Sequence, residues 1–369
     1  MSSNFIRFKS HFLSNGGASA IVGGQFGSEA KGLAAGLVAE HCSPRWRSDV
    51  ICTTNAGAQA GHTTVMENGN KFVCYHLPTV GVLQPETLIY LNPGSIIDVD
   101  LLISEVKLVS KATGEDTSKL ISRIRIHPNA AVISNAHKVV ESTGTRDIGS
   151  TQKGVGAALS DKVMRKVDSV ASKSHKLNFT FRVDPINLAS HMAHGGIVVI
   201  EIPQGTGLSL NNGPFFPKCT SRDCWVGQGL ADAGIHPHFH NYTLMVQRTL
   251  PIRVGHIYDE AGNKVGDSGP FYSDSKELNW SSDLPGIQPE ITTVTKRQRR
   301  IATFSYKQYY DALTLNRPSY ILNTFCNYMT EEQLTRHAGL MREVENRVGV
   351  HPTHLWSFGP RVSDTRETI

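Results

Sequence analysis

The residues best suited to chemistry lie in a glycine-rich segment near the N-terminus, Gly-Gly-Gln-Phe-Gly-Ser-Glu-Ala-Lys-Gly at residues 23–32. An apolar run at residues 20–22 precedes this segment, and a helical pattern follows it. A glycine-rich turn between a strand and a helix gathers backbone N–H groups and a helix N-terminus around a phosphate. Lys31 occupies the position of a P-loop lysine, whereas Ala30 and Gly32 depart from that consensus. Alone, the segment fits a modified phosphate loop and an ordinary strand–turn–helix corner equally well.

Further motifs rich in glycine and polar residues follow along the chain. They are Asn-Ala-Gly-Ala-Gln-Ala-Gly-His-Thr-Thr (55–64), Ile-Gly-Ser-Thr-Gln-Lys-Gly-Val-Gly (148–156), Glu-Ile-Pro-Gln-Gly-Thr-Gly (201–207) and Ser-Phe-Gly-Pro (357–360). In this order and at these separations, the set resembles the adenylosuccinate synthetase family. The resemblance runs from about residue 20 to the C-terminus. It is specific because separate motifs must coincide.

Alternating apolar runs and helical patterns predict an α/β fold with a large, mostly parallel central sheet flanked by helices. Strand-like runs lie at residues 20–24, 50–54, 88–92, 121–126, 197–202 and 320–325. Helical patterns lie at residues 33–40, 99–110, 157–167, 242–250 and 331–348, and residues 255–300 have the composition of long loops. We expect residues 1–18 to form a flexible N-terminal extension. Residues 19–369 should form a single catalytic domain with a P-loop-like nucleotide site at the carboxyl ends of the strands.

The composition is that of a globular protein that binds small anions. Lys+Arg 37 and Asp+Glu 32 give a formal net charge of +5, which suits phosphate-bearing substrates and does not require nucleic acid. No apolar run is long enough to predict a membrane span, and residues 1–17 lack a signal-peptide core. The 6 cysteines form no Cys-x-x-Cys pair. We therefore expect reduced thiols and a cytoplasmic location, in a host cell if a phage encodes the chain.

The resemblance implies four catalytic residues. His62 would act as a general acid on the oxygen that bridges two phosphates, and Lys31 would neutralise the transferring phosphoryl group. Gln204 would contact the 6-oxygen of the purine, and Ser28 stands where the family has an aspartate. The implied cofactor is Mg²⁺, with Ser28 and the backbone oxygen of Gly61 as its protein ligands.

The resemblance also implies three sets of binding residues. The nucleotide substrate would contact Ser28, Glu29, Ala30, Lys31, Gln59, Ala60, Gly61, His62, Ser150, Thr151, Arg165, Gln204 and Thr220. The phosphoryl donor would contact Gly27, Gly32, Gly61, His62, Thr63, Arg299, Asn323, Thr324, Ser357, Gly359 and Pro360. L-Aspartate would be bound by Val294, Thr295, Arg297 and Arg299, since guanidinium groups bind carboxylates bidentately. Arg165 aligns with an arginine that reaches the partner subunit's nucleotide in the family, which implies a homodimer.

One departure from the family concerns the purine. The family's loop carries Asp-Glu-Gly-Lys where this chain has Ser28-Glu29-Ala30-Lys31. The missing aspartate would remove the N1 proton of IMP, and a well-placed base contributes on the order of a hundredfold or more. A carboxylate there would crowd the 2-amino group of guanine, whereas a hydroxyl leaves room and can accept a hydrogen bond from it. We therefore predict dGMP as the substrate, with the 2-aminoadenine precursor N6-succino-2-amino-2′-deoxyadenylate as the product.

A second departure concerns the donor. The family reads the guanine of GTP with an aspartate after a late strand, a position that falls here on Cys326 or Asn327. Without a carboxylate, selectivity for guanine should fall. We therefore expect ATP or dATP as the donor, without a preference between them.

Three alternatives remain open at this point. A conventional adenylosuccinate synthetase would use IMP and GTP and would have to tolerate Ser28. A catalytically inactive nucleotide sensor would not need the acid His62. A nucleic-acid-binding protein would use the basic cluster at residues 296–300.

Overall fold

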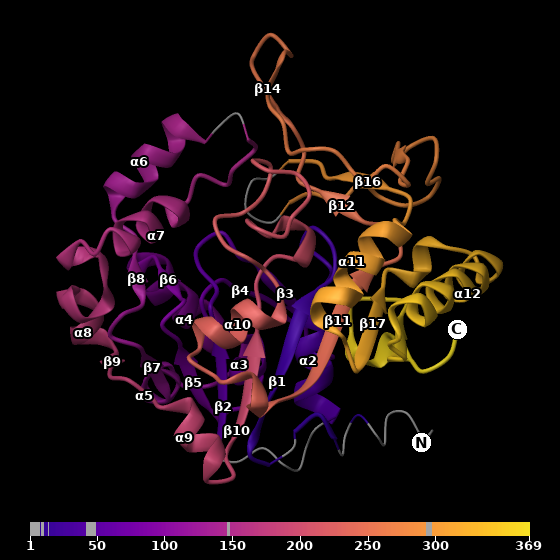
Figure 1. Cartoon of the computed structure of the whole chain (residues 1–369). Helices are drawn as coiled ribbons and strands as arrows, with labels where there is room; N and C mark the ends of the chain where they lie inside the picture. The colour runs from indigo at the N-terminus through magenta and orange to yellow at the C-terminus, as the bar shows by residue number, and fades with distance from the viewer. Residues whose placement is uncertain (1–7, 9–10, 14, 42–48, 146–147, 293–296) are drawn as a thin grey trace.

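The molecule is organised by an open and almost entirely parallel sheet (Figure 1). The computed structural model describes residues 8, 11–13, 15–41, 49–145, 148–292 and 297–369. Within these residues the main sheet has 10 strands, all parallel to their neighbours except β19. In spatial order they are β19 (Thr365–Arg366), β18 (Thr353–Ser357), β17 (Tyr320–Thr324), β11 (His240–Arg248), β1 (Gly17–Gly23), β10 (Ile197–Glu201), β2 (Val50–Thr54), β5 (Leu88–Leu91), β7 (Ile124–Ile126) and β9 (Arg182–Val183). The predicted α/β fold with a mostly parallel sheet is confirmed.

Helices flank this sheet, as the alternating sequence pattern predicts. They are α2 (Lys31–His41), α3 (Thr79–Leu83), α4 (Val99–Thr113), α5 (Thr117–Ser122), α6 (Asn135–Gly144), α7 (Val155–Val163), α8 (His175–Thr180), α9 (Leu188–Ala193), α10 (Val226–Asp232), α11 (Tyr306–Asn316) and α12 (Glu331–Val348). In Figure 1, α11 and α12 lie near β17, α9 lies beside β10, and α5 and α8 lie toward the edge formed by β7 and β9. None of the described helices is both long and apolar enough to cross a membrane.

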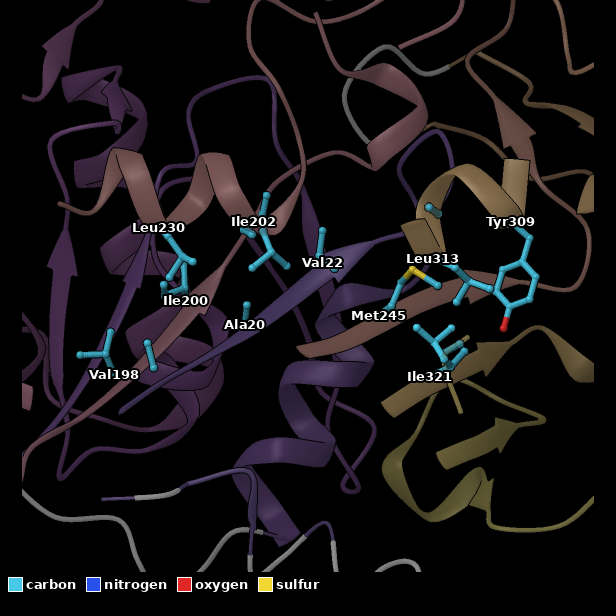
Figure 2. Close-up of a cluster of buried hydrophobic side chains, with 14 of the residues drawn as sticks. Ala20, Val22, Val198, Ile200, Ile202, Leu230, Met245, Tyr309, Leu313 and Ile321 are labelled. Carbon is cyan, nitrogen blue, oxygen red and sulfur yellow. The ribbon is translucent and has the colours of Figure 1, made fainter. Parts of the chain in front are cut away.

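The central strand β1 is buried on both faces. Ala20 and Val22 face one way, where Met245 of β11 and the helices α10 and α11 pack (Figure 2). Ile21 faces the other way, into a second cluster that contains α2. This double burial explains why residues 20–22 of β1 form a continuous apolar run.

The N-terminal segment differs from the flexible extension that we expected. Among its described residues, Phe8, Phe12 and Leu13 are fully buried and belong to the cluster beneath α2. The Phe8 ring meets the edge of Tyr320 at a centroid distance of 5.1 Å. In addition, β1 begins at Gly17, inside the expected extension. The described part of this segment therefore contributes to the core.

The helix predicted at residues 242–250 is wrong, because these residues lie mainly in β11. This strand pairs with β1 on one side and β17 on the other, and residues 243–248 are all buried. A short run that is buried all round gives no periodicity by which a strand differs from a helix. The strand predicted at 121–126 is also shorter, because Asp116 caps a helix, α5, over its first residues.

The region 255–300 forms long connections, as expected, with short strands among them. The strands β12 (Ile252–Arg253), β16 (Arg300–Ala302) and β15 (Glu277–Leu278) form one small sheet. A hairpin of β13 (Ile257–Tyr258) and β14 (Lys264–Gly266) projects from the molecule at the top of Figure 1. The remaining short strands are β3 (His62–Val65) paired with β4 (Lys71–Cys74), and β6 (Ile96–Ile97) paired with β8 (Ala131–Val132).

We predict that Phe12→Ala lowers the free energy of unfolding by about 3–5 kcal/mol, because it leaves a cavity in the core. Phe179→Ala is the matched control, since that ring is 94% exposed and its loss should change stability by no more than about 0.5 kcal/mol. Denaturant unfolding of both variants measures the difference. An equal free energy of unfolding for the two variants would contradict a stabilising role of Phe12 in the core.

Candidate active site

The glycine-rich loop between β1 and α2 has an unusual backbone. Gly27, Ser28 and Ala30 have φ values of 84°, 59° and 71°. Such left-handed residues turn successive N–H groups inward, which is how backbone loops hold phosphates. Two of the three are not glycine, so the conformation costs on the order of 1–3 kcal/mol each. The surrounding structure must therefore hold this loop in place.

The buried carboxylate of Glu29 does so. Its Oε1 accepts hydrogen bonds from the backbone N–H groups of Gly27 at 2.7 Å and Gln25 at 3.2 Å. Its Oε2 lies 2.8 Å from the Lys31 Nζ, and the carboxylate is fully buried. We predicted that Glu29 would contact the nucleotide, but this geometry commits its carboxylate to the loop itself.

Lys31 joins this loop to the turn that follows β10. Its Nζ also donates a hydrogen bond to the backbone oxygen of Gln204, a residue with φ 57°. A Cβ at Gly205 would lie 2.3 Å from Glu29 Oε1, and a Cβ at Gly23 would lie 2.5 Å from Glu29 Oε2. Glycine is needed at both positions because the two segments meet at the Glu29 carboxylate.

A cavity of about 370 Å³ opens beside this junction. The predicted site residues that line it are Ser28, Ala30, Lys31, Gly61, His62, Thr63, Arg299, Thr324, Gly359 and Pro360. They come from the glycine-rich loop, the start of β3, the basic cluster, the end of β17 and the turn after β18. The fold thus brings together five segments that contain residues predicted from the sequence for the site.

Two lining residues that the sequence analysis missed form an ion pair at the cavity wall. Arg248, at the end of β11, donates to both carboxylate oxygens of Glu290, and its Nη1 donates to the Ser28 backbone oxygen at 3.2 Å. The Arg248 guanidinium also stacks on Phe325, 3.5 Å from the ring centroid. The sequence analysis missed Arg248 because it predicted a helix at residues 242–250. A strand that ends at Arg248 would have placed this residue at the carboxyl ends of the strands, where the cavity lies.

Glu290 is the one carboxylate among the described residues that line this cavity. Burial alone would raise its pKa, but the guanidinium groups of Arg248 and Arg299 outweigh burial and hold the pKa below its usual value. Tyr328 donates to it at 3.0 Å, and burial together with the Glu290 charge raises the pKa of Tyr328 to about 12. Glu290 is therefore ionised and already paired, which leaves no free carboxylate on the described cavity wall.

The basic cluster turns inward rather than forming an open patch. Arg299 lies 3.7 Å from Glu290, and Arg300 pairs with Glu277 at 2.5 Å. Arg297 donates to the Gly255 backbone oxygen at 3.2 Å. Val294, Thr295 and Lys296 lie outside the described residues. The observed pairing argues against a nucleic-acid-binding surface at this cluster.

Other predicted residues do not line the cavity. Gly32 packs on the Thr63 backbone, where a Cβ would lie 2.0 Å from the carbonyl oxygen. Asn323, in β17, is buried and accepts a hydrogen bond of 3.0 Å from Gln247. The remaining predicted residues outside the cavity lining are Gly27, Glu29, Gln59, Ala60, Ser150, Thr151, Arg165, Gln204, Thr220, Arg297 and Ser357. Of these, Ser150 and Thr151 precede α7 and Arg165 follows it, and their contacts with ligands stay predictions.

The oxygen donors expected for Mg²⁺, the Ser28 hydroxyl and the Gly61 carbonyl, belong to exposed residues on the cavity wall. The described residues contain no group of three or more His, Cys, Asp or Glu side chains that could hold a metal. Mg²⁺ retains several waters and commonly binds through substrate phosphates. A hydroxyl and a carbonyl therefore fit an ion whose remaining ligands are phosphate oxygens and water.

The family model for adenylosuccinate synthetase matches residues 20–182. The N6-succino-2-amino-2′-deoxyadenylate synthase of Salmonella phage PMBT28 is 35% identical over 95% of this chain and 97% of its own. The chain belongs to the adenylosuccinate synthetase family. Within this family, the N6-succino-2-amino-2′-deoxyadenylate synthase of Cyanophage S-2L is 34% identical over 94% of this chain and 92% of its own, and the adenylosuccinate synthetase of Pyrococcus horikoshii is 29% identical over 95% and 98%.

Solved structures of the adenylosuccinate synthetase family have the same fold. The Cyanophage S-2L succinoaminodeoxyadenylate synthetase, bound to dGMP and to dATP as an energy donor, has a TM-score of 0.78 at 31% identity and covers 95% of both chains. The fully ligated adenylosuccinate synthetase of Plasmodium falciparum has a TM-score of 0.73 at 19% identity, covering 94% of this chain and 98% of its own. At that identity, the second likeness shows the fold alone.

We predict that Gly205→Ala lowers kcat on the order of a hundredfold, because the new methyl group displaces Glu29 and with it Lys31, and a shift of about 1 Å has that cost. Gly205 has φ −151°, so alanine causes no backbone strain there. Gly339→Ala is the control, because a Cβ at that helical position meets nothing within 4 Å. It should leave kcat unchanged and raise stability by up to about 1 kcal/mol. Full activity in Gly205→Ala would contradict the requirement for glycine where the turn after β10 meets the Glu29 carboxylate.

Proposed function

We propose that this chain is a ligase that joins L-aspartate to C6 of dGMP, with ATP or dATP as the phosphoryl donor, to give N6-succino-2-amino-2′-deoxyadenylate. One observation carries the proposal: the cavity is lined at position 28 by a serine, and the neighbouring carboxylate, Glu29, is fully buried in the loop. A guanine 2-amino group next to residue 28 would have room there and could donate a hydrogen bond to the serine hydroxyl. The similarity to phage enzymes of this name over nearly the whole chain supports the same substrate.

The chemistry follows from the cavity residues. The 6-oxygen of dGMP forms a bond to the γ-phosphorus while the bond to the bridging oxygen breaks. That oxygen keeps the electron pair and receives a hydrogen bond from His62, the general acid. Lys31 and the N-terminus of α2 bind the transferring phosphoryl group. Mg²⁺, when bound, neutralises charge on the donor phosphates.

In the second step the amine of L-aspartate bonds to C6 and phosphate leaves. Arg297 and Arg299 would hold the carboxylates of L-aspartate. The amine gives up a proton as it bonds to C6, and the leaving phosphate carries that proton away. The N1 proton leaves earlier, when the 6-oxygen attacks the γ-phosphorus in the first step, and Ser28 is a poor base for it. Because Glu29 is buried, we assign this proton to a carboxylate of the bound L-aspartate.

The cavity also favours an adenine donor. Asn327 lines it, whereas Cys326 is fully buried, and burial raises the pKa of the Cys326 thiol to about 12. Neither side chain offers guanine the carboxylate that its N1 and N2 groups would need. The related S-2L enzyme binds dATP as its energy donor, which agrees with this assignment.

A homodimer that works in the cytoplasm completes the proposal. Around Arg165, the side chains of Val163, Met164 and Val167 are 67%, 69% and 69% exposed. Large apolar side chains grouped on a surface commonly mark an interface. A second subunit packed there would bring Arg165 toward its neighbour, as the family resemblance implies. In sedimentation experiments the parent should be a dimer and the Met164→Glu variant a monomer.

A conventional adenylosuccinate synthetase is the second candidate, favoured by the similarity to the Pyrococcus horikoshii enzyme. We predict that dGMP with ATP is turned over at least tenfold faster than IMP with GTP. In Ser28→Asp the ratio should shift toward IMP by roughly 10–100-fold, because a carboxylate crowds the 2-amino group and supplies a base. Ser28→Ala, which removes the hydroxyl without adding a base, should weaken dGMP turnover without improving IMP. Faster turnover of IMP by the parent would reject the dGMP assignment.

We further predict that His62→Ala still binds dGMP but forms product about 10²–10⁴-fold more slowly, since it lacks the general acid. Equilibrium binding and single-turnover assays separate these two properties. This result would also exclude a nucleotide sensor, for which the acid has no purpose. An unaltered single-turnover rate would remove His62 from the chemistry.

A further inference from the structure

A buried carboxylate at the end of β10 lies directly behind the proposed general acid. Glu201 is 1% exposed, and its Oε2 is 3.4 Å from the Nδ1 of His62. Its Oε1 accepts a hydrogen bond of 2.6 Å from the backbone N–H of Val80, in the first turn of α3. One oxygen therefore fixes the carboxylate to the scaffold while the other faces the imidazole.

The two nitrogens of His62 have different surroundings. Nδ1 faces Glu201, whereas Nε2 is buried and has no hydrogen-bond partner among the described residues. His62 also lines the cavity. Nε2 is thus the nitrogen left for a ligand, and the carboxylate on the opposite side limits how the ring can turn.

The surroundings of Glu201 offer its charge few other partners. Within the described chain, His62 is the basic side chain recorded at ion-pair distance from Glu201. The thiols of Cys52 and Cys74 are close enough to feel the Glu201 charge, but both are fully buried, and burial raises the pKa of each. A buried carboxylate without a partner is costly, so Glu201 and His62 stabilise one another.

We infer that Glu201 is a positioning residue for the reaction, an inference that rests on the proposed role of His62. It holds the imidazole through Nδ1 so that Nε2 points to the oxygen that leaves the γ-phosphorus. It also stabilises positive charge on the ring while that oxygen becomes negative. A carboxylate that orients a histidine from behind is a recurring device in enzymes. Its loss lowers activity about 10–100-fold behind metal-bound histidines and about 10⁴-fold in the serine-protease triad.

The chain contains a matched control for a purely structural pair. Glu105 on α4 is also buried, lies 2.9 Å from the Nδ1 of His76, and accepts backbone hydrogen bonds from residues 75–77. Neither Glu105 nor His76 lines the cavity. Glu105→Gln removes the same charge from the same kind of pair at a site with no proposed role in the reaction.

The experiment compares Glu201→Gln with Glu105→Gln, using whichever purine nucleotide the parent converts faster. In Glu201→Gln, kcat should fall roughly 10–100-fold, while the KM values for nucleotide, donor and L-aspartate change less than threefold. The ¹⁵N resonances of His62 should also change, because an amide facing Nδ1 alters which nitrogen carries the proton. Glu105→Gln should leave kcat and these resonances unchanged in the folded fraction.

A kcat within threefold of the parent in folded Glu201→Gln would overturn the inference, as would a loss confined to KM. If Glu201→Gln does not fold, Glu201→Asp, which keeps the charge on a shorter side chain, and His62→Gln are each compared with the double variant Glu201→Asp/His62→Gln. The two kcat losses should be non-additive, and additive losses would reject the coupling. Preference for IMP over dGMP would contradict the proposed substrate but would leave this comparison valid.

Discussion

The buried carboxylate of Glu29 is the interaction on which the site depends. It accepts hydrogen bonds from two backbone N–H groups of its own loop and pairs with Lys31. Removing one partner of such a buried pair typically costs about 3–5 kcal/mol, because a charge is left without compensation. This carboxylate offsets the strain of the left-handed residues around it. It also fixes the Lys31 ammonium between the loop and the turn after β10, where we propose that a phosphate binds.

The same interaction determines what the purine meets. With Glu29 turned inward, the loop lines the cavity with Ser28, Ala30 and Lys31, of which Ser28 carries a hydroxyl. Arg248 holds the Ser28 backbone oxygen and pairs with Glu290, which joins the loop to the segment that leads into the arginine cluster. The glycine-rich loop, the end of β11 and the arginine cluster proposed to bind L-aspartate are thus connected through buried charge pairs. A displacement of one of these segments should therefore displace the others.

The sequence was sufficient for the features that depend on local chemistry. The strands β1, β2, β10 and β17 were predicted as apolar runs, and residues from the segments that follow β1, β2 and β17 line the cavity. It was insufficient for β11, because a strand buried between two others lacks a periodic pattern. That error concealed Arg248. Glu201 and His62 are 139 positions apart in the sequence (201 − 62), and no local pattern predicts a contact between residues so far apart.

The most direct test of this account is a crystal structure with dGMP and a non-hydrolysable ATP analogue bound. The account predicts that the 2-amino nitrogen of guanine lies within about 3.2 Å of the Ser28 Oγ, a normal hydrogen-bond distance, while the Glu29 carboxylate keeps its contacts with Lys31 and Gly27. A base that turns its 2-amino group away from Ser28, or a Glu29 carboxylate that leaves the loop to contact the base, would contradict it.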